Sequence, residues 1–453
     1  MKKYDLIVLG GGTGGMGMFF RAAAAGWKTA IVESSLLGGS CINTGCIPSK
    51  TLISSGRAMQ TVRDAYKLGV IAEPPRADWP AMVQRKEQII REKRSGSYKG
   101  VEDNDNITLY EGEASFTAPY TVEVNGEFLT SDKIVIATGA RPAVPPVPGL
   151  SDVDYLTSTS AMVMKELPGS LLVLGAGTIA LEFSQLFARL GVEVTVMQRG
   201  ARPASNLEPE ISEEIRKVLE AEGVKIKSKV NIGSVGAEGG SVFLVDEKTE
   251  GPVRYSAERI LVATGRTPNT DMLNLEKTGV KTDKKGFITV DENFESSAKG
   301  IWAIGDVIGG AMFTHKSWHD GLLLSRHMLK GEKIVTSGRL IPFTIFTEPE
   351  IAGVGMGENE AGEAGYEVKV QRFPFSSSPR AKAIAKTDGF IKLVLDSNDG
   401  KILGAHIIGP EAGELIHELF AAIRFGATVY DLQDMMHVHP TLCEAINNTA
   451  WSA

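Results

Sequence analysis

The sequence of 453 residues has few cysteines, no excess of basic residues and no long apolar run. Its three cysteines cannot form the disulfide framework of a small secreted protein, so a disulfide here would serve chemistry rather than stability. The net charge of −7 disfavours a nucleic-acid-binding surface. The first apolar run, Leu6–Phe20, is shorter than the ~20 residues of a membrane span. Its regularly spaced glycines also argue against a signal peptide. We therefore expect a cytoplasmic protein that binds neither nucleic acid nor membrane.

Glycine is abundant, and it gathers in short loops that follow apolar runs. One such loop, residues 10–15, follows the run Tyr4–Leu9, and a second, residues 175–180, follows Leu171–Leu174. A helical stretch and another apolar run come next in each copy, which is the βαβ pattern of a dinucleotide-binding domain. Later in each copy a strand ends in Ala-Thr-Gly, at 137–139 and 263–265. This duplication predicts an α/β protein with two Rossmann-like domains. The loop residues expected to contact nucleotides are Gly10, Gly12, Gly15, Thr138, Gly139, Gly175, Gly177 and Gly265.

The spacing of these motifs predicts the order of the domains. The first copy is longer than the second because residues 41 to about 110 form an insertion, and a proline-rich segment, 141–149, separates the copies. The pattern of Gly300–Asp306 indicates a return to the first domain, and strands and an amphipathic helix after about 337 indicate an α+β module. The predicted boundaries are 1–147 and 268–336 for the first dinucleotide domain, 148–267 for the second, and 337–453 for the C-terminal module.

The two glycine loops differ in the residues that follow them. In the first, the phosphates of a nucleotide would lie at a helix N-terminus, and Glu33 at the end of the next strand could accept hydrogen bonds from a ribose. In the second, Arg199 and Arg202 stand where a ribose-binding carboxylate is expected. Guanidinium groups pair with a 2′-phosphate, so we expect NADP(H) to be favoured, with NAD(H) possible. The alternative is that both arginines are solvated surface charges.

Two cysteines, Cys41 and Cys46, lie in the glycine-bounded segment Gly38–Lys50. Residues five apart in a regular helix are separated by about 7.5 Å along the axis, whereas a disulfide needs Cα atoms about 4.4–6.8 Å apart. We therefore expect a distorted turn at Gly45, with Cys46 at a helix N-terminus, where a thiolate is favoured. Two buried, unreactive cysteines are the alternative. Their place in a nucleotide-binding domain favours a redox-active pair.

The C-terminal segment His437–Glu444 contains a candidate base. Exchange at a dithiol needs a group that takes up and returns a proton near neutral pH, and imidazole is suited to this. Glu444 could hold one ring nitrogen of His439 and fix its tautomer. We expect His437 to be structural and Cys443 to be a small packing residue rather than a third redox centre.

Together these motifs resemble the class I pyridine nucleotide–disulfide oxidoreductases, and among them the dihydrolipoamide dehydrogenases. The resemblance spans essentially the whole chain. It implies two Rossmann-like domains, for FAD and for NAD(P), followed by a C-terminal α+β dimerisation domain. It also implies a homodimer and a flavin between the dithiol and the nicotinamide.

The resemblance implies a role for individual residues. Cys41 would attack the substrate, Cys46 would face the flavin, and Lys50 and Glu182 would form an ion pair beside the flavin and nicotinamide. His439 would be the base and Glu444 its partner, supplied across a two-fold interface. Gly39, Ser40 and Asp306 would contact FAD. Departures from the family pattern are Phe19, Trp318–His319 and Cys443.

Several substrates fit this resemblance. A lipoyl group suits the dithiol and His439 segments best, but an NADPH preference is unusual for a lipoamide enzyme and leaves room for a glutathione-type disulfide reductase. Mercuric reductase is a further relative, although neither its C-terminal cysteine pair nor a preceding Cys-x-x-Cys domain is expected here, and no bound metal is expected. A flavin-binding redox sensor is the non-enzymatic alternative.

Overall fold

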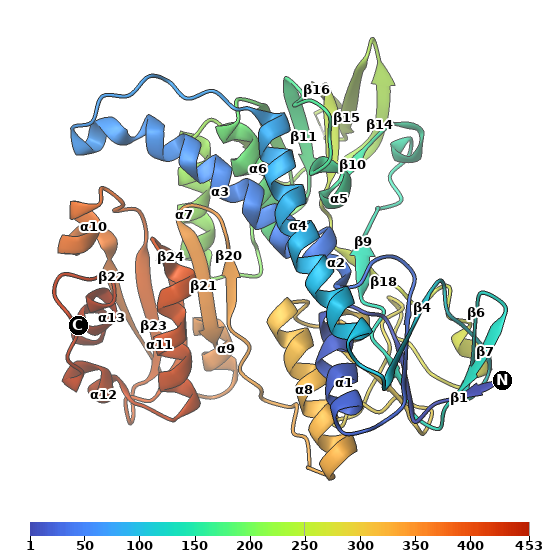
Figure 1. Cartoon of the computed structure of the whole chain (residues 1–453). Helices are drawn as coiled ribbons and strands as arrows, with labels where there is room; N and C mark the ends of the chain where they lie inside the picture. Colours follow the sequence, from blue (N-terminus) through green and yellow to red (C-terminus); the bar gives the residue numbers. More distant parts are fainter. Residues whose placement is uncertain (249, 453) are drawn as a thin grey trace. The chain divides into compact units, whose positions relative to one another are not determined.

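The computed structural model describes residues 1–248 and 250–452, and Figure 1 shows its helices and strands. The chain forms two compact units, each built from three segments. Unit 1 contains residues 1–51, 81–143 and 265–339, and unit 2 contains residues 52–80, 144–264 and 340–453. Two of the boundaries between the units fall within long helices, α3 (Cys46–Arg63) and α4 (Trp79–Glu102).

A five-stranded parallel sheet forms the centre of unit 1. Its inner strands are buried and largely aliphatic, as expected for a parallel sheet covered on both faces, whereas the edge strand Ile107–Glu111 is only partly buried. Their order is β19 (Ile301–Ala303), β8 (Ile134–Ile136), β2 (Leu6–Leu9), β3 (Thr29–Glu33) and β4 (Ile107–Glu111). Strand β19 pairs with β8, so the segment near residue 300 lies in the same sheet as the strand before the first glycine loop.

Unit 2 contains a second parallel sheet with the same arrangement. Its order is β10 (Leu156–Thr157), β17 (Arg259–Val262), β11 (Ser170–Leu174), β12 (Glu193–Met197) and β13 (Lys225–Lys227). In unit 1, β2 leads into the glycine loop and lies between β8, which runs into Ala-Thr-Gly, and β3, which follows the first helix. In unit 2, β11 lies in the same way between β17 and β12. The duplication predicted from the sequence is therefore present in the strand order.

Smaller sheets accompany both parallel sheets. In unit 1 a four-stranded sheet has the order β1 (Lys2–Lys3), β7 (Glu127–Thr130), β6 (Thr121–Val124) and β5 (Ser115–Ala118). Strand β1 is parallel to β7, and the other neighbours are antiparallel. A two-stranded ribbon pairs β18 (Arg266–Pro268) with β9 (Ala140–Pro142). In unit 2 a three-stranded sheet has the order β14 (Ile232–Glu238), β15 (Ser241–Asp246) and β16 (Val253–Ala257).

The C-terminal module is an antiparallel sheet packed against helices. Its strands are β20 (Phe343–Ile345), β21 (Glu350–Gly355), β24 (Ile402–Gly409), β23 (Phe390–Asp396) and β22 (Val368–Pro374), in that order. Helix α11 (Ala412–Arg424) packs along β21 and β24, and its apolar side joins a core that includes Ile407 and Leu419. The α+β class predicted for this part of the chain is therefore confirmed.

The remaining helices connect or cover these sheets. Figure 1 shows α1 and α8 side by side, and their contacts agree with this view. The helices are α1 (Thr13–Ala24), α2 (Gly39–Asn43), α5 (Ser158–Ala161), α6 (Thr178–Arg189), α7 (Pro209–Ala221), α8 (Thr314–Lys330), α9 (Glu358–Glu363), α10 (Pro379–Ala383), α12 (Val429–Asp434) and α13 (Glu444–Trp451). Within the described ranges, no helix has both the length and the apolar character that crossing a bilayer requires.

Candidate active site

The two cysteines of the motif lie on either side of a break between two helices. Cys41 is in the short helix α2, and Cys46 is the first residue of α3. The expected break between the cysteines is present, but the segment before it is helical rather than an open turn. Both cysteines are thiols in this structure. The Cys41 thiol is hydrogen-bonded to Cys46, and this bond together with burial raises the pKa of Cys41.

Threonine hydroxyls contact this pair of thiols. The hydroxyl of Thr314, the first residue of α8, lies 3.0 Å from the sulfur of Cys46. Hydrogen bonds from Thr314 and from Thr13, the first residue of α1, oppose the increase in the pKa of Cys41. The sequence motif did not reveal Thr314, because it lies 268 residues from Cys46 along the chain.

Asn43, between the two cysteines, holds the dithiol segment in place. Its side-chain amide donates to the carbonyl oxygens of Leu36, Leu37 and Gly39 at 3.2, 3.1 and 3.0 Å. Arg94 of α4 donates to its amide oxygen at 3.4 Å. Sequence reasoning missed Asn43, although a polar side chain inside the cysteine motif was the available signal.

The dithiol segment packs directly on the first glycine loop. A Cβ atom on Gly39 would lie 2.7 Å from the Cα of Gly12, so only glycine permits this approach. Gly10 has φ +110°, and a Cβ there would lie 2.3 Å from the carbonyl oxygen of Ala137. The dithiol segment, the first glycine loop and Ala137 are far apart in the sequence, and the backbone brings them into contact.

Glu33 stabilises the first glycine loop from the end of β3. Its carboxylate accepts hydrogen bonds from the backbone N–H groups of Gly11 (2.7 Å) and Ser35 (2.9 Å). Burial raises the pKa of Glu33, and these two bonds oppose the increase. The carboxylate therefore fixes the turn on which a nucleotide would lie, and its expected contact with a ribose stays a prediction.

Two further segments of unit 1 carry predicted FAD contacts. Thr138 donates to the carbonyl oxygen of Asn269 (2.8 Å), and the Asn269 amide returns a bond to the Thr138 carbonyl (2.9 Å). Asp306 accepts a bond from Ser317 at 3.2 Å and lies 3.8 Å from Arg266. The Gly305 N–H donates to the buried Asp320 at 3.1 Å, which fixes the turn before Asp306. Ser40 is exposed, and Gly139 has φ +71°.

The residues that depart from the family pattern have defined contacts in the structure. Phe19 is fully buried against Phe20, with the two ring centroids 4.5 Å apart. The guanidinium of Arg21 lies over the Trp318 ring, 4.9 Å from its centroid. Arg339 contacts both His319 (3.1 Å) and Asp320 (2.6 Å). These substitutions are accommodated by local packing and ion pairs.

The second glycine loop lies in unit 2 with the same backbone form as the first. Gly175 has φ +107°, and a Cβ there would lie 2.4 Å from the carbonyl oxygen of Ala263. Arg199 is exposed, whereas Arg202 is half-buried. Among the described residues, Arg202 Nε and Gln198 Oε1 are buried without a hydrogen-bond partner. Gly265 belongs to unit 1 and has φ +128°.

The predicted ion pair has one member in each unit. Lys50 lies one turn after Cys46 on α3, in unit 1, and Glu182 lies on α6, in unit 2. The buried Glu182 carboxylate accepts the N–H of Phe346 at 2.9 Å. The pairing of Lys50 with Glu182 stays a prediction.

His439 and Glu444 form the dyad that the sequence predicted, in unit 2. His439 Nδ1 lies 2.8 Å from Glu444 Oε1, and the Thr441 N–H donates to Glu444 Oε2 at 2.8 Å. The Thr441 bond and then the His439 bond lower the pKa of Glu444, so this carboxylate stays ionised. The His439 side chain is 69% exposed.

His437 and Cys443, which neighbour this dyad in the sequence, differ from it in burial and contacts. His437 is 9% exposed and pairs with Glu418 at 2.9 Å. Cys443 packs against the C-terminal core, and burial followed by the charge of Glu418 raises its pKa. Both residues have the structural surroundings that the sequence analysis expected for them.

The residues present fit the two nucleotide cofactors. Among the described side chains none caps the N-terminus of α1 or α6 and no acidic residue lies in either first turn, so these backbone N–H groups suit phosphates. The buried, unsatisfied Arg202 Nε likewise suits an anionic group. Within the part of the chain that the structure describes, no cluster of three or more side chains is suited to a metal ion.

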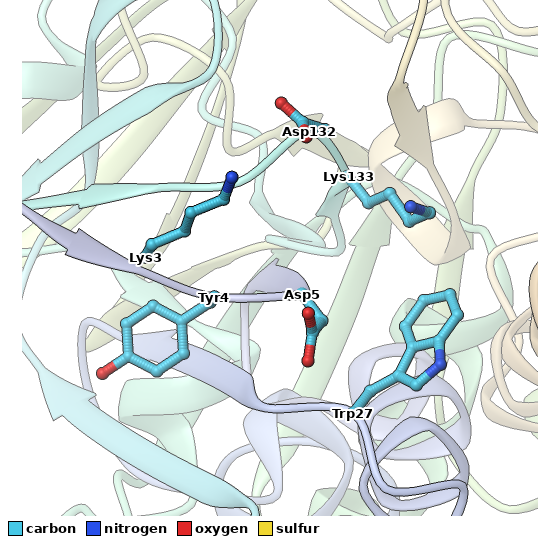
Figure 2. Close-up of a pocket in the computed structure, with 6 residues that line it drawn as sticks. All are labelled: Lys3, Tyr4, Asp5, Trp27, Asp132 and Lys133. Atoms are coloured by element: carbon cyan, nitrogen blue, oxygen red, sulfur yellow. The ribbon is translucent and has the colours of Figure 1, made fainter.

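A hollow of about 410 Å³ lies outside these residues, in unit 1. Figure 2 shows its lining, in which the Lys133 ammonium lies over the Trp27 ring, 5.3 Å from the centroid. The lining residues are Lys3, Tyr4, Asp5, Trp27, Asp132 and Lys133. None of them is a predicted site residue, so this hollow is separate from the redox site.

Comparison with known proteins defines the class. The family model for pyridine nucleotide-disulphide oxidoreductases matches residues 4–321, and the model for the dimerisation domain of these enzymes matches residues 341–450. The chain therefore belongs to the pyridine nucleotide–disulfide oxidoreductase family, which comprises flavoproteins that use FAD and NAD(P)H.

Individual relatives have different activities. A mercuric reductase of Staphylococcus aureus is 38% identical over 447 residues, which cover 99% of this chain and 82% of the relative. A dihydrolipoyl dehydrogenase of Thermus scotoductus is 37% identical, with 99% and 97% covered. The Cu(II) complex of the HOCl-induced flavoprotein disulfide reductase RclA from Escherichia coli is similar over 100% of this chain and 99% of that one, with a TM-score of 0.91 and 29% identity.

Proposed function

We propose that this chain is an enzyme that transfers two electrons between NAD(P)H and a disulfide substrate through Cys41 and Cys46, with a lipoyl group as the substrate. One observation carries the proposal: the two thiols are hydrogen-bonded to each other in a segment that packs on the first glycine loop. A pair of structural cysteines would not need this position.

The chemistry at the dithiol can be written as balanced steps. The Cys41 thiolate attacks one sulfur of the lipoyl disulfide, so a Cys41–lipoyl bond forms as the lipoyl S–S bond breaks. The Cys46 thiolate then attacks Cys41, which forms the Cys41–Cys46 disulfide and releases the second lipoyl sulfur. The two departing sulfurs take up the two protons that the cysteines lose. Oxidation of a dihydrolipoyl group is the same sequence in reverse.

Reduction of the Cys41–Cys46 disulfide then needs two electrons and two protons. When bound, FAD would carry the electron pair between the nicotinamide and Cys46. Gly10, Gly12, Gly15 and Gly39 would let the backbone approach the FAD, and Glu33, Thr138 and Asp306 would orient it.

His439 would move the protons between Cys41 and the substrate. Glu444 holds Nδ1 of His439, which leaves Nε2 for proton transfer. In the family-type homodimer that we propose, this dyad would serve the dithiol of the partner chain, since the chain contains a dimerisation domain. Near the dyad, Met436 and Val438 are 99% and 76% exposed, and a second copy would cover these apolar side chains.

Hg(II) is the second candidate substrate, because mercuric reductases are among the relatives. The His439–Glu444 dyad favours the disulfide substrate over the metal ion. The two sulfurs of a reduced disulfide take up two protons, whereas Hg(II) takes up none when it is reduced to the metal, so a group that returns protons to the product suits the disulfide.

A substrate panel tests the proposal. The flavin-loaded protein is assayed with lipoamide, glutathione disulfide and Hg(II), each with NADPH and with NADH. We expect the highest kcat/KM for lipoamide, loss of this turnover in Cys41→Ser with FAD retained, and wild-type turnover in the control Cys443→Ser. Full lipoamide turnover in Cys41→Ser would contradict the proposed role of Cys41, and a higher kcat/KM for Hg(II) would favour the second candidate.

We also propose that Arg199 and Arg202 favour NADPH over NADH. Charge-assisted hydrogen bonds contribute about 1.5–3 kcal/mol each, so Arg202→Ala should raise the KM for NADPH by roughly 10- to 100-fold. The KM for NADH should not change, because NADH lacks the 2′-phosphate. The matched control is Lys217→Ala on α7, which removes an exposed charge from the same unit. A clear NADH preference in the wild-type protein would refute this proposal.

A further inference from the structure

The carboxylate of Asp320, on α8, is fully buried and is shared by three partners in unit 1. Its Oδ1 accepts a hydrogen bond from Arg339 at 2.6 Å, and its Oδ2 lies 2.7 Å from the Lys316 ammonium. Oδ2 also accepts the backbone N–H of Gly305 at 3.1 Å. A buried charge is stable only when it is paired and hydrogen-bonded, and this cluster meets both conditions.

The Gly305 N–H connects this cluster to a residue that we expect to contact FAD. Gly305 directly precedes Asp306, whose carboxylate accepts the Ser317 hydroxyl at 3.2 Å. Ser317 lies on α8, one turn before Asp320. Helix α8 therefore holds Asp306 in two ways, directly through Ser317 and indirectly through the backbone that Asp320 fixes.

Helix α8 is itself fixed against α1, the helix that follows the first glycine loop. A Cβ on Gly321 would lie 2.5 Å from the carbonyl oxygen of Gly14 and 3.0 Å from the Cα of Gly17, so the two helices are in backbone contact. Asp320 is the neighbour of Gly321 and moves with this pair of helices. The carboxylate thus has a fixed position relative to the loop on which the phosphates of FAD would lie.

Arg339 is the member of the cluster that lies outside α8. Lys316 and Asp320 are four residues apart on the helix and pair without help from another segment. The Arg339 guanidinium adds a hydrogen bond from the segment after the helix, and it also contacts the ring of His319 at 3.1 Å. A planar guanidinium that bridges two neighbouring side chains in this way restricts both of them.

We propose that Asp320 and Arg339 are positioning residues for FAD. They fix the backbone at Gly305, and this sets the place of the Asp306 carboxylate that would orient the cofactor. The fully buried Asp320 acts through the Gly305 N–H and has no need to touch FAD. This inference rests on the proposed function, because it takes Asp306 as an FAD contact.

The alternative is that the cluster contributes only to stability. Substitution of Asp320 would leave buried cations unpaired and would unfold the protein under either view. Arg339 variants are more informative, because Lys316 still pairs with Asp320. Arg339→Gln and Arg339→Met remove the charge in two ways, so that failure of one to fold leaves the other, and Arg339→Lys keeps the charge. The matched control is Arg326→Gln, an exposed position on α8.

The test measures the Kd for FAD of the full chain. Each variant is loaded with FAD and dialysed to equilibrium against a series of FAD concentrations, and the bound flavin is quantified. We expect Arg339→Gln and Arg339→Met to raise this Kd by about tenfold, because a charge-assisted hydrogen bond that holds the FAD contact is lost. Arg339→Lys should restore most of the affinity, and Arg326→Gln should have the wild-type Kd.

A double-mutant cycle with Asp306→Asn separates positioning from stability. If Arg339 acts through Asp306, Arg339→Gln should change the Kd by less than about twofold once Asp306 has been replaced. A cluster that only stabilises the fold would give the same fold-change in both backgrounds. Equal fold-changes, or a wild-type Kd in the Arg339 variants, would overturn the inference.

The outcome also separates this inference from the proposed function. If the Kd values do not follow the cycle but NADPH reduces the Cys41–Cys46 disulfide of the wild-type protein, only the role of Asp320 and Arg339 is wrong. If the cycle holds but NADPH fails to reduce that disulfide, the positioning role stands and the proposed electron transfer is wrong.

Discussion

Single residues in this chain differ in role according to their hydrogen-bond partners. His437 and His439 are two positions apart, and each contacts a glutamate. His437 is nearly buried against Glu418, whereas the His439 ring is mostly exposed and is oriented by Glu444. The exposed His439 imidazole, with its tautomer fixed, is accessible to a substrate, whereas the His437 ring is covered and pairs with Glu418.

We expect His439→Gln to lower kcat for lipoamide by about 10²- to 10⁴-fold, because general acid–base catalysis contributes this much. The control, His437→Gln, should keep its turnover and lose only stability. Equal losses of kcat in the two variants would show that neither residue is the base, and steady-state kinetics across pH 5–9 distinguish the outcomes.

The residues of the candidate site were predictable to the extent that they lie in local motifs. Cys41, Cys46 and the His439–Glu444 dyad each stand in a short, distinctive segment. The contact of Thr314 with Cys46 and the hydrogen bonds of Asn43 were not predicted. The Thr314 contact joins residues far apart in the chain, and the three bonds of the Asn43 amide depend on a short helix of five residues, which is too brief to show a periodic pattern.

Among the elements, α6 shows how a helix face can organise a neighbouring segment. Glu182, Gln185 and Arg189 follow each other at spacings of three and four, so they share one face. Gln185 exchanges two hydrogen bonds with the backbone of Glu348, at 2.7 and 2.8 Å. Arg189 bonds the Glu348 carboxylate at 2.6 Å. This face of α6 therefore fixes the segment that leads into β21.

Glu348 makes this attachment sensitive to acid. Burial alone would raise the pKa of Glu348, but Lys386 and Arg189 outweigh burial and lower it below the ordinary value of 4.5. A lowered carboxyl pKa contributes stability that is fully present above the unfolded-state pKa and is lost as the pH falls through the folded-state pKa.

We therefore expect Glu348→Gln to lower the free energy of unfolding by about 1–3 kcal/mol at pH 7 and to flatten its decrease below pH 4.5. Urea unfolding of the wild-type protein and the variant between pH 3.5 and 7 measures both effects. The exposed Glu363→Gln on α9 is the control and should retain the wild-type pH dependence. If Glu348→Gln has the wild-type acid slope, the ion pairs do not stabilise this segment.

For the whole molecule, the dominant feature is a duplicated dinucleotide fold followed by a different module. The two parallel sheets have matching strand orders, and the sequence predicted this because apolar runs, glycine loops and Ala-Thr-Gly ends recur. The antiparallel C-terminal sheet was predicted only as a class. Its strand order depends on contacts between distant segments, which leave no periodic signal in the sequence. The substrate is likewise not encoded in any one motif.

The most direct test of this account is an anaerobic titration of the oxidised, flavin-loaded protein with one equivalent of NADPH, followed by thiol counting at each cysteine. We predict that two thiols appear per chain, at Cys41 and Cys46, while Cys443 stays unchanged. No new thiols, or new thiols that involve Cys443, would contradict the claim that the Cys41–Cys46 pair receives the electrons.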